Sequence, residues 1–127
     1  LDHISSSARE EQVSILLPQI QQIAGLHISI LTGDFNCDEE SSPYHAITNS
    51  FYTDSRSTAK NIVNGTLKSF TEFHKTEEIP QGRYNIDFIF TSGFDTSSWE
   101  LISDLTKQKR ALSDHRAIVS ELVRVAF

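Results

Sequence analysis

Several features are scarce in this sequence of 127 residues, and each scarcity narrows the kind of protein it can be. A single cysteine, Cys37, rules out an intrachain disulfide and favours a reducing compartment such as the cytoplasm. No apolar run approaches the roughly 20 residues of a membrane-spanning helix, so we expect no membrane span. Only 11 basic residues stand against 17 acidic ones, and a net charge of -6 argues against binding duplex nucleic acid by bulk charge.

What is present indicates an ordinary globular protein, with 38% hydrophobic and 22% charged residues spread without long biased runs. The length fits one hydrophobic core and leaves no room for two. The first residue is Leu1 rather than Met, so we expect residues 1–127 to be part of a domain that is continued upstream.

The first half of the sequence predicts two helices around one strand. Ser7 to Glu10 has the form of a capping box and starts a helix that Gly25 ends, with a kink or early stop at Pro18. Its expected buried face is Val13, Leu16, Leu17, Ile20, Ile23 and Ala24. A short, largely buried strand is expected over residues 26–31, and a second helix from Ser42-Pro43 to about Asn49.

Beyond residue 49 the sequence predicts irregular structure to Gly65 and then mainly strands, separated by a loop at residues 92–97. The expected strands are residues 67–70, 84–91, 98–105 and 117–127. This order predicts an α/β layered domain with a mixed sheet.

Polar residues follow or interrupt apolar strands at three places, which is where α/β sheets tend to form their sites. These segments are Gly33-Asp34-Phe35-Asn36, Asn85 to Phe90 with Asp87 inside an apolar run, and Ser113-Asp114-His115. The first could simply be a turn and the third a loop cap, whereas a buried Asp87 needs a partner or a metal ion. Together the three supply acids, an amide and an imidazole from separate regions, which favours a catalytic site.

These motifs, in this order, resemble the C-terminal half of endonuclease/exonuclease/phosphatase proteins. Further residues that fit the pattern are Leu1-Asp2-His3, Ala8-Arg9, Gln12, Gly65-Thr66 and Phe70. The resemblance implies half of a four-layered α/β sandwich of the DNase I-like kind, a mixed sheet with helices on one face. It also implies that each half of the domain contributes most of one of two stacked sheets.

The same resemblance implies a role for each matching residue. Asp34 would orient or deprotonate the attacking water, and His115 would contact the scissile phosphate with Asp87 bonded to its other ring nitrogen. Asp114 would bind a divalent metal ion, with Asp34 and Asn36 in or beside the metal shell and Asn36 also on a phosphate oxygen. Mg²⁺ suits such oxygen ligands, and Mn²⁺ is the alternative.

Some of the family's residues have no counterpart here. The pattern has a His directly before Leu1 and a metal-binding Glu and an Asn in its N-terminal half, so His3 is not the catalytic His. Asp2 and Arg9 are expected to form a structural ion pair. The remaining candidates are expected to be surface or packing residues: His27, His45, His74, Cys37, Arg56 and Arg83.

The leading functional hypothesis is therefore a metal-dependent phosphoesterase acting on a phosphodiester or phosphomonoester, with nucleic acid among the candidate substrates. The alternative is a non-catalytic binding or scaffold domain that keeps the fold. We expect the chain to need the missing N-terminal half for activity. Alone it would pair with a second copy, because apolar strand residues would lack a covering sheet, either Ile86, Phe88, Phe90, Val119 and Val123 or their neighbours on the opposite face.

Overall fold

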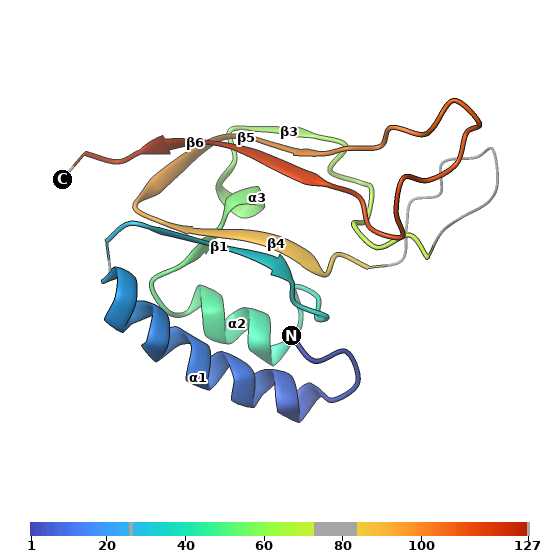
Figure 1. Cartoon of the computed structure of the whole chain (residues 1–127). Helices are drawn as coiled ribbons and strands as arrows, with labels where there is room; N and C mark the ends of the chain where they lie inside the picture. Colours follow the sequence, from blue (N-terminus) through green and yellow to red (C-terminus); the bar gives the residue numbers. More distant parts are fainter. Residues whose placement is uncertain (26, 73–83, 127) are drawn as a thin grey trace.

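The computed structural model describes residues 1–25, 27–72 and 84–126 and consists of three layers (Figure 1). Two helices cover one face of a first sheet, and a second sheet lies across the other face with a short helix between the two sheets. The elements are α1 (Ser6–Ala24), β1 (Ser29–Asp34), α2 (Ser42–Thr48), β2 (Thr53–Asp54), α3 (Ser55–Thr58), β3 (Asn61–Val63), β4 (Asp87–Ser92), β5 (Phe94–Leu101) and β6 (Ile118–Arg124). The α/β prediction is confirmed, including the helices on one outer face.

Helix α1 starts two residues before the predicted capping box, so that prediction was wrong. The N-cap is Ser5, whose Oγ accepts a hydrogen bond from the Ala8 N–H at 3.2 Å. The Asp2 carboxylate favours this earlier start because its Oδ1 accepts from the Ser5 N–H at 2.6 Å. The helix runs through Pro18 without stopping and ends at Gly25, as predicted.

Only the first part of the predicted apolar face of α1 is covered. Val13 is buried, and Leu17 and Ile20 pack against the core, whereas Ile23 is 85% exposed. Helix α2 packs beside α1 and is capped by Ser41 rather than Ser42, with Pro43 in its first turn.

The first sheet has the strand order β1-β4-β2, with both pairs antiparallel. Strand β1 begins later than predicted and includes Gly33 and Asp34, and it is not largely buried, since Ile30 is 50% exposed. Its burial is limited because β1 is an edge strand, with no second partner among the residues that the structure describes. The register places Asp34 opposite Asp87.

Gly93 forms the corner at which the chain passes from the first sheet to the second. Its φ angle is 78°, and a Cβ atom there would lie 2.0 Å from the main-chain oxygen of His27, so only glycine fits. Strand β5 follows at once and pairs with β3 in parallel and with β6 antiparallel. The predicted loop at residues 92–97 is therefore wrong, because pairing with β6 makes this polar stretch a strand.

Other strand predictions need similar correction. Residues 67–70 form no strand, although Phe70 makes single bridges to Tyr84 and His115. The segment expected to be a strand over 98–105 lies at 94–101 instead, and β2, α3 and β3 occupy part of the stretch expected to be irregular. Strands β4 and β6 lie within the predicted ranges 84–91 and 117–127, apart from Ser92 at the end of β4.

Within the described residues, each of the two facing sheets has three strands, so the expectation that the chain would supply most of one sheet is wrong. Phe88 and Phe90 are 4% and 0% exposed, because they point to the helix layer rather than to a missing sheet. By contrast, Val119 and Val123 are 52% and 54% exposed, as expected. Along the described residues, no helix is long and apolar enough to cross a membrane.

The two facing sheets are connected by α3 along one pair of edges, called the closed side below, and are not connected in this way along the opposite pair, called the open side. Strands β2 and β3, linked by α3, are edge strands on the closed side, whereas β1 and β6 are the opposite edges of their sheets. Neither β1 nor β6 has a further partner strand among the described residues. The predicted site residues lie toward this open side, because Asp34 ends β1 and His115 precedes β6.

Candidate active site

The centre of the site is a hydrogen bond between His115 and Asp87. His115 Nδ1 lies 2.8 Å from Asp87 Oδ2, and both side chains are partly buried. Asp87 is the first residue of β4, and His115 lies three residues before β6, so the pair joins the two sheets. This pair was predicted from the sequence, and the structure brings it together.

Asp34 lies on the other side of the imidazole ring. Its Oδ2 is 3.8 Å from His115 Nε2, and 37% of its side chain is exposed. The antiparallel register of β1 and β4 sets this position, because it places Asp34 directly opposite Asp87. His115 thus has one carboxylate near each ring nitrogen.

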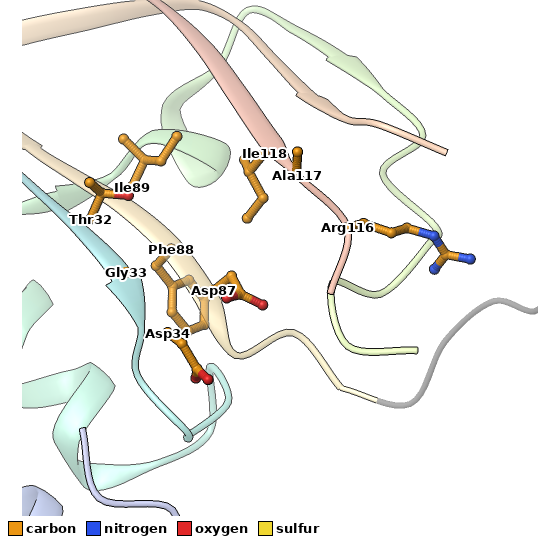
Figure 2. A pocket seen from close by; sticks show the side chains of 9 residues that line it. All are labelled: Thr32, Gly33, Asp34, Asp87, Phe88, Ile89, Arg116, Ala117 and Ile118. Carbon is orange, nitrogen blue, oxygen red and sulfur yellow. The ribbon is translucent and has the colours of Figure 1, made fainter. Parts of the chain in front are cut away.

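A pocket of about 210 Å³ opens between the two sheets beside these carboxylates (Figure 2). Asp34 and Asp87 lie at the same end of it, and the Arg116 guanidinium points away from both. Arg116 instead donates to the main-chain oxygen of Lys68 at 2.7 Å. At this end the pocket is therefore lined by two carboxylates, and the positive charge of Arg116 is directed elsewhere.

The charges around His115 favour its cationic form. Burial alone would lower the pKa of His115, but the hydrogen bond to Asp87, followed by the charges of Asp87, Asp34 and Asp114, raises it above the ordinary value of 6.5. In its cationic form His115 has an N–H on both ring nitrogens, so one can point toward Asp87 and the other toward Asp34. The ring is thus suited to donate a hydrogen bond to an anionic group.

Asn36 and Asp114 lie near this centre without joining it directly. The Asn36 Nδ2 donates to the main-chain oxygen of Leu1 at 2.7 Å, and its own N–H donates to Asp34 Oδ1 at 2.8 Å. Its φ angle of 50°, in a region that asparagine tolerates, makes the tight turn after β1. The Asp114 carboxylate accepts from Ser113 Oγ at 3.1 Å.

Three ligand atoms among the described residues lie close enough together to hold a metal ion. They belong to Asp34, Asp87 and His115 and are all within 4.8 Å of one another. This set differs from the predicted ligands Asp114, Asp34 and Asn36. Since Asp87 already holds His115 Nδ1, and a charged imidazole is no metal ligand, the more accessible oxygen ligand in the set is the Asp34 carboxylate.

Sequence reasoning missed a group of buried polar residues beneath Asp87. Ser69, Thr71 and Asn85 are 0%, 3% and 4% exposed. Ser69 Oγ lies 3.1 Å from the Ile86 nitrogen and 3.3 Å from the Asp87 nitrogen, and both N–H groups donate to it. Asn85 was noted only as the start of the segment that contains Asp87, and no signal singled out Ser69 and Thr71, because their partners are distant along the chain.

The remaining predicted residues divide into three outcomes. Cys37 is buried in the core, as predicted. The predicted Asp2–Arg9 ion pair is wrong, because Arg9 Nη1 donates to the main-chain oxygen of Asp2 at 3.1 Å, whereas the Asp2 carboxylate accepts from the Ser5 N–H. Arg56 is not a solvated surface residue, because it pairs with Glu39 at 2.9 Å and stacks over Trp99. His27 and His45 are exposed, and His74 and Arg83 lie outside the described residues.

No family model matches the sequence, and no curated protein matches it. Solved structures do match. An endonuclease/exonuclease/phosphatase from Bacteroides vulgatus is 29% identical with a TM-score of 0.81, and 98% of this chain covers 47% of that protein. A family protein from Bacteroides thetaiotaomicron is 27% identical with a TM-score of 0.86, over 99% of this chain and 48% of that one.

A third match is the mannosyl-6-phosphatase of Bacteroides thetaiotaomicron VPI-5482, which is 26% identical with a TM-score of 0.83, over 97% of this chain and 48% of that one. In all three comparisons this chain spans about half the length of the matched protein. The chain is thus similar, in its motifs and in its structure, to endonuclease/exonuclease/phosphatase family proteins, and its coverage of about half of their length is consistent with a C-terminal half.

Proposed function

We propose that this chain is part of a metal-dependent phosphoesterase, which cleaves a phosphate ester with an activated water molecule. The observation that carries the proposal is the placement of His115 between Asp87 at 2.8 Å and Asp34 at 3.8 Å, next to an open pocket. Such a group combines a proton acceptor, Asp34, with a donor to an anionic oxygen, His115. Matches to family proteins, one of them a phosphatase, support the same reaction class.

Each residue of the site would have a separate task in this reaction. Asp34 would accept a proton as the water oxygen bonds to phosphorus and the bond to the ester oxygen breaks. His115 would donate a hydrogen bond from Nε2 to a phosphate oxygen as negative charge builds there. Asp87 would keep the ring in one orientation and favour its cationic form.

The residues present fit a divalent cation of the Mg²⁺ kind. Mg²⁺ prefers carboxylate and amide oxygens, and it usually binds through one or two carboxylates plus the substrate phosphate. Asp34 offers an accessible carboxylate. Asn36 follows Asp34 by two residues, and Asp114 directly precedes His115. When bound, the cation would neutralise charge on the phosphate, and Mn²⁺ is the alternative.

The substrate would be a small phosphate ester or a nucleic acid. One matched structure is a mannosyl-6-phosphatase, so a sugar phosphate is a reasonable first substrate to assay. The charge of -6 does not favour tight binding to duplex nucleic acid.

The matched family proteins are about twice as long as this chain, and we propose that the N-terminal half implied by the family resemblance would complete this site. The α-amino group of Leu1 donates to the main-chain oxygen of Asp34 at 2.9 Å. Leu1 therefore lies next to Asp34, and the family resemblance implies a histidine directly before Leu1. A metal-binding Glu would come from the same N-terminal half.

We expect a protein containing both halves to hydrolyse a phosphomonoester, such as mannose 6-phosphate or p-nitrophenyl phosphate, or the diester bis(p-nitrophenyl) phosphate. Activity should require Mg²⁺ or Mn²⁺ and disappear with EDTA, because the cation neutralises the phosphate charge. Residues 1–127 alone should be inactive with the same substrates. Release of phosphate or p-nitrophenol is the measurement, and metal-independent hydrolysis or activity of the isolated chain would contradict the proposal.

Residues 1–127 alone are expected to form a dimer with a second copy. On the outer face of the second sheet, Val63, Val119 and Val123 are 39%, 52% and 54% exposed, and the edge of β6 has no partner strand among the described residues. Covering apolar surface yields about 25 cal/mol per Å², and an isologous contact covers the same face twice. Light scattering should show twice the mass of 14.3 kDa.

The substitution Val119→Lys should return this dimer to a monomer, because it places a charge in the contact. Ile23→Lys is a matched control, since Ile23 is 85% exposed and lies at the end of α1. A monomer at every concentration of the unaltered chain would refute the association, and a dimer that survives Val119→Lys would move the contact elsewhere.

A further inference from the structure

The Asp87–His115 pair joins two chain segments that belong to different sheets. Strand β4 begins at Asp87 in the first sheet, and His115 precedes β6 in the second. A separation of 2.8 Å between Oδ2 and Nδ1 therefore needs something to fix one segment against the other. The three residues Ser69, Phe70 and Thr71, called the bridging segment below, lie between them.

On the Asp87 side, the bridging segment makes its contacts through Ser69 and through Phe70, whose N–H donates to the main-chain oxygen of Tyr84 at 2.9 Å. The Oγ of Ser69 accepts from the N–H groups of Ile86 and Asp87, and its own N–H donates to Asn85 Oδ1 at 3.2 Å. Asn85 is held in turn by Glu39, whose Oε1 accepts from Asn85 Nδ2 at 2.9 Å. Ser69 is fully buried, so water cannot replace these hydrogen bonds.

On the His115 side, the contacts come from all three residues. The main-chain oxygen of Ser69 accepts from the Arg116 N–H at 2.7 Å, and the N–H and Oγ1 of Thr71 donate to the main-chain oxygen of Asp114 at 2.7 Å and 3.0 Å. The Phe70 ring lies 5.1 Å from the His115 ring. The residues before and after His115 are thus both held by the bridging segment.

We propose that Ser69 and Thr71 are positioning residues, which set the separation of Asp87 and His115 through their hydrogen bonds to the two segments that carry this pair. Neither side chain is placed to touch the reacting phosphate, so they act through the two residues that they align. This inference rests on the proposed function, because it concerns the same pair. It assigns a role to two residues that no motif in the sequence had marked.

The test is an NMR measurement on the ¹⁵N-labelled chain of residues 1–127, and it needs no hydrolysis. The Nδ1–H proton of His115, bonded to Asp87, should give a downfield signal that exchanges slowly with water. Ser69→Ala removes the acceptor of the Asp87 N–H, and Thr71→Val keeps the side-chain shape while removing the hydroxyl. Each should speed exchange of that proton by about three- to tenfold, the effect of losing one hydrogen bond.

Ser55→Ala is the matched control. Ser55 is also fully buried and its hydroxyl is bonded to another side chain, Ser120 Oγ at 2.9 Å, but it lies in α3, outside the bridging segment. It should lower the unfolding midpoint without changing the His115 signal. If Ser69→Ala does not fold, Thr71→Val decides the result, because its main-chain hydrogen bond to Asp114 remains.

The outcomes separate this inference from the proposed function. Unchanged exchange of the His115 proton in Ser69→Ala and Thr71→Val, or an equal change in Ser55→Ala, would show that these residues are merely structural. Absence of the downfield proton in the unaltered chain would contradict the Asp87–His115 pair, and with it the observation behind the proposed function.

Discussion

Replacing His115 with alanine in a protein that contains both halves is expected to lower kcat by about 10²-fold or more, since stabilisation of transition-state charge is typically that large. The ring of His115 is held by Asp87 on one side, and its Nε2 lies 3.8 Å from Oδ2 of Asp34, which lines the pocket. Alanine leaves no donor for the phosphate oxygen. The measurement is steady-state hydrolysis of p-nitrophenyl phosphate at saturating Mg²⁺.

Asp34→Ala should reduce kcat by a similar factor, because it removes the proposed proton acceptor. Since the two residues serve one step, the double variant should lose much less than the product of the two single losses. His45→Ala is the control, because His45 is exposed on α2. Near-normal turnover in His115→Ala or Asp34→Ala would remove that residue from the mechanism.

The acid and imidazole residues of the site could be predicted because they sit in short sequence motifs. Asp34 ends a strand, Asp87 interrupts an apolar one, and both come together as soon as β1 and β4 pair in antiparallel register. His115 joins them because the segment before β6 is held against the first sheet. The residues that hold it, Ser69 and Thr71, gave no local signal because their partners are distant in the sequence.

The fold predictions failed where non-local pairing outweighed local composition. Residues 94–97 are mostly polar and follow a glycine, a pattern typical of a loop, yet they pair with β6. Gly93 was expected within that loop, whereas it forms the corner at which a continuous ribbon changes sheets. Conversely, the apolar residues at 67–70 suggest a strand, but within this segment the described β-bridges are single ones, from Phe70 to Tyr84 and to His115.

The polar site and the aromatic core depend on the same alternation of side chains. In β4, Asp87 and Ile89 point toward the second sheet, and Phe88 and Phe90 point toward the helices. The turn after β1 follows the same logic, since Phe35 lies in the core between Asp34 and Asn36. Packing of the aromatic rings therefore helps determine where the carboxylates point.

Among the substitutions proposed for this chain, Phe90→Ala is accordingly expected to lower the free energy of unfolding most, by about 3–5 kcal/mol, as is typical of a buried phenylalanine. Phe90 is 0% exposed, and its ring lies 5.1 Å from that of Phe35, 5.3 Å from Phe88 and 5.7 Å from Tyr44. Since α1, α2 and β1 all meet around it, the cavity cannot close without moving one of them. A loss of this size is a large part of a domain's usual total of about 5–15 kcal/mol.

Urea unfolding followed by circular dichroism measures this loss, at several protein concentrations because association would raise the apparent stability. Ile23→Ala is the control, with an expected change within about 0.5 kcal/mol, since Ile23 is 85% exposed. Phe90→Ala should also speed the exchange of the His115 Nδ1–H proton with water, because its partner Asp87 lies on the same strand as Phe90. A loss below about 1 kcal/mol would mean that the helix layer does not hold β4, and the link from this core to the site would then be wrong.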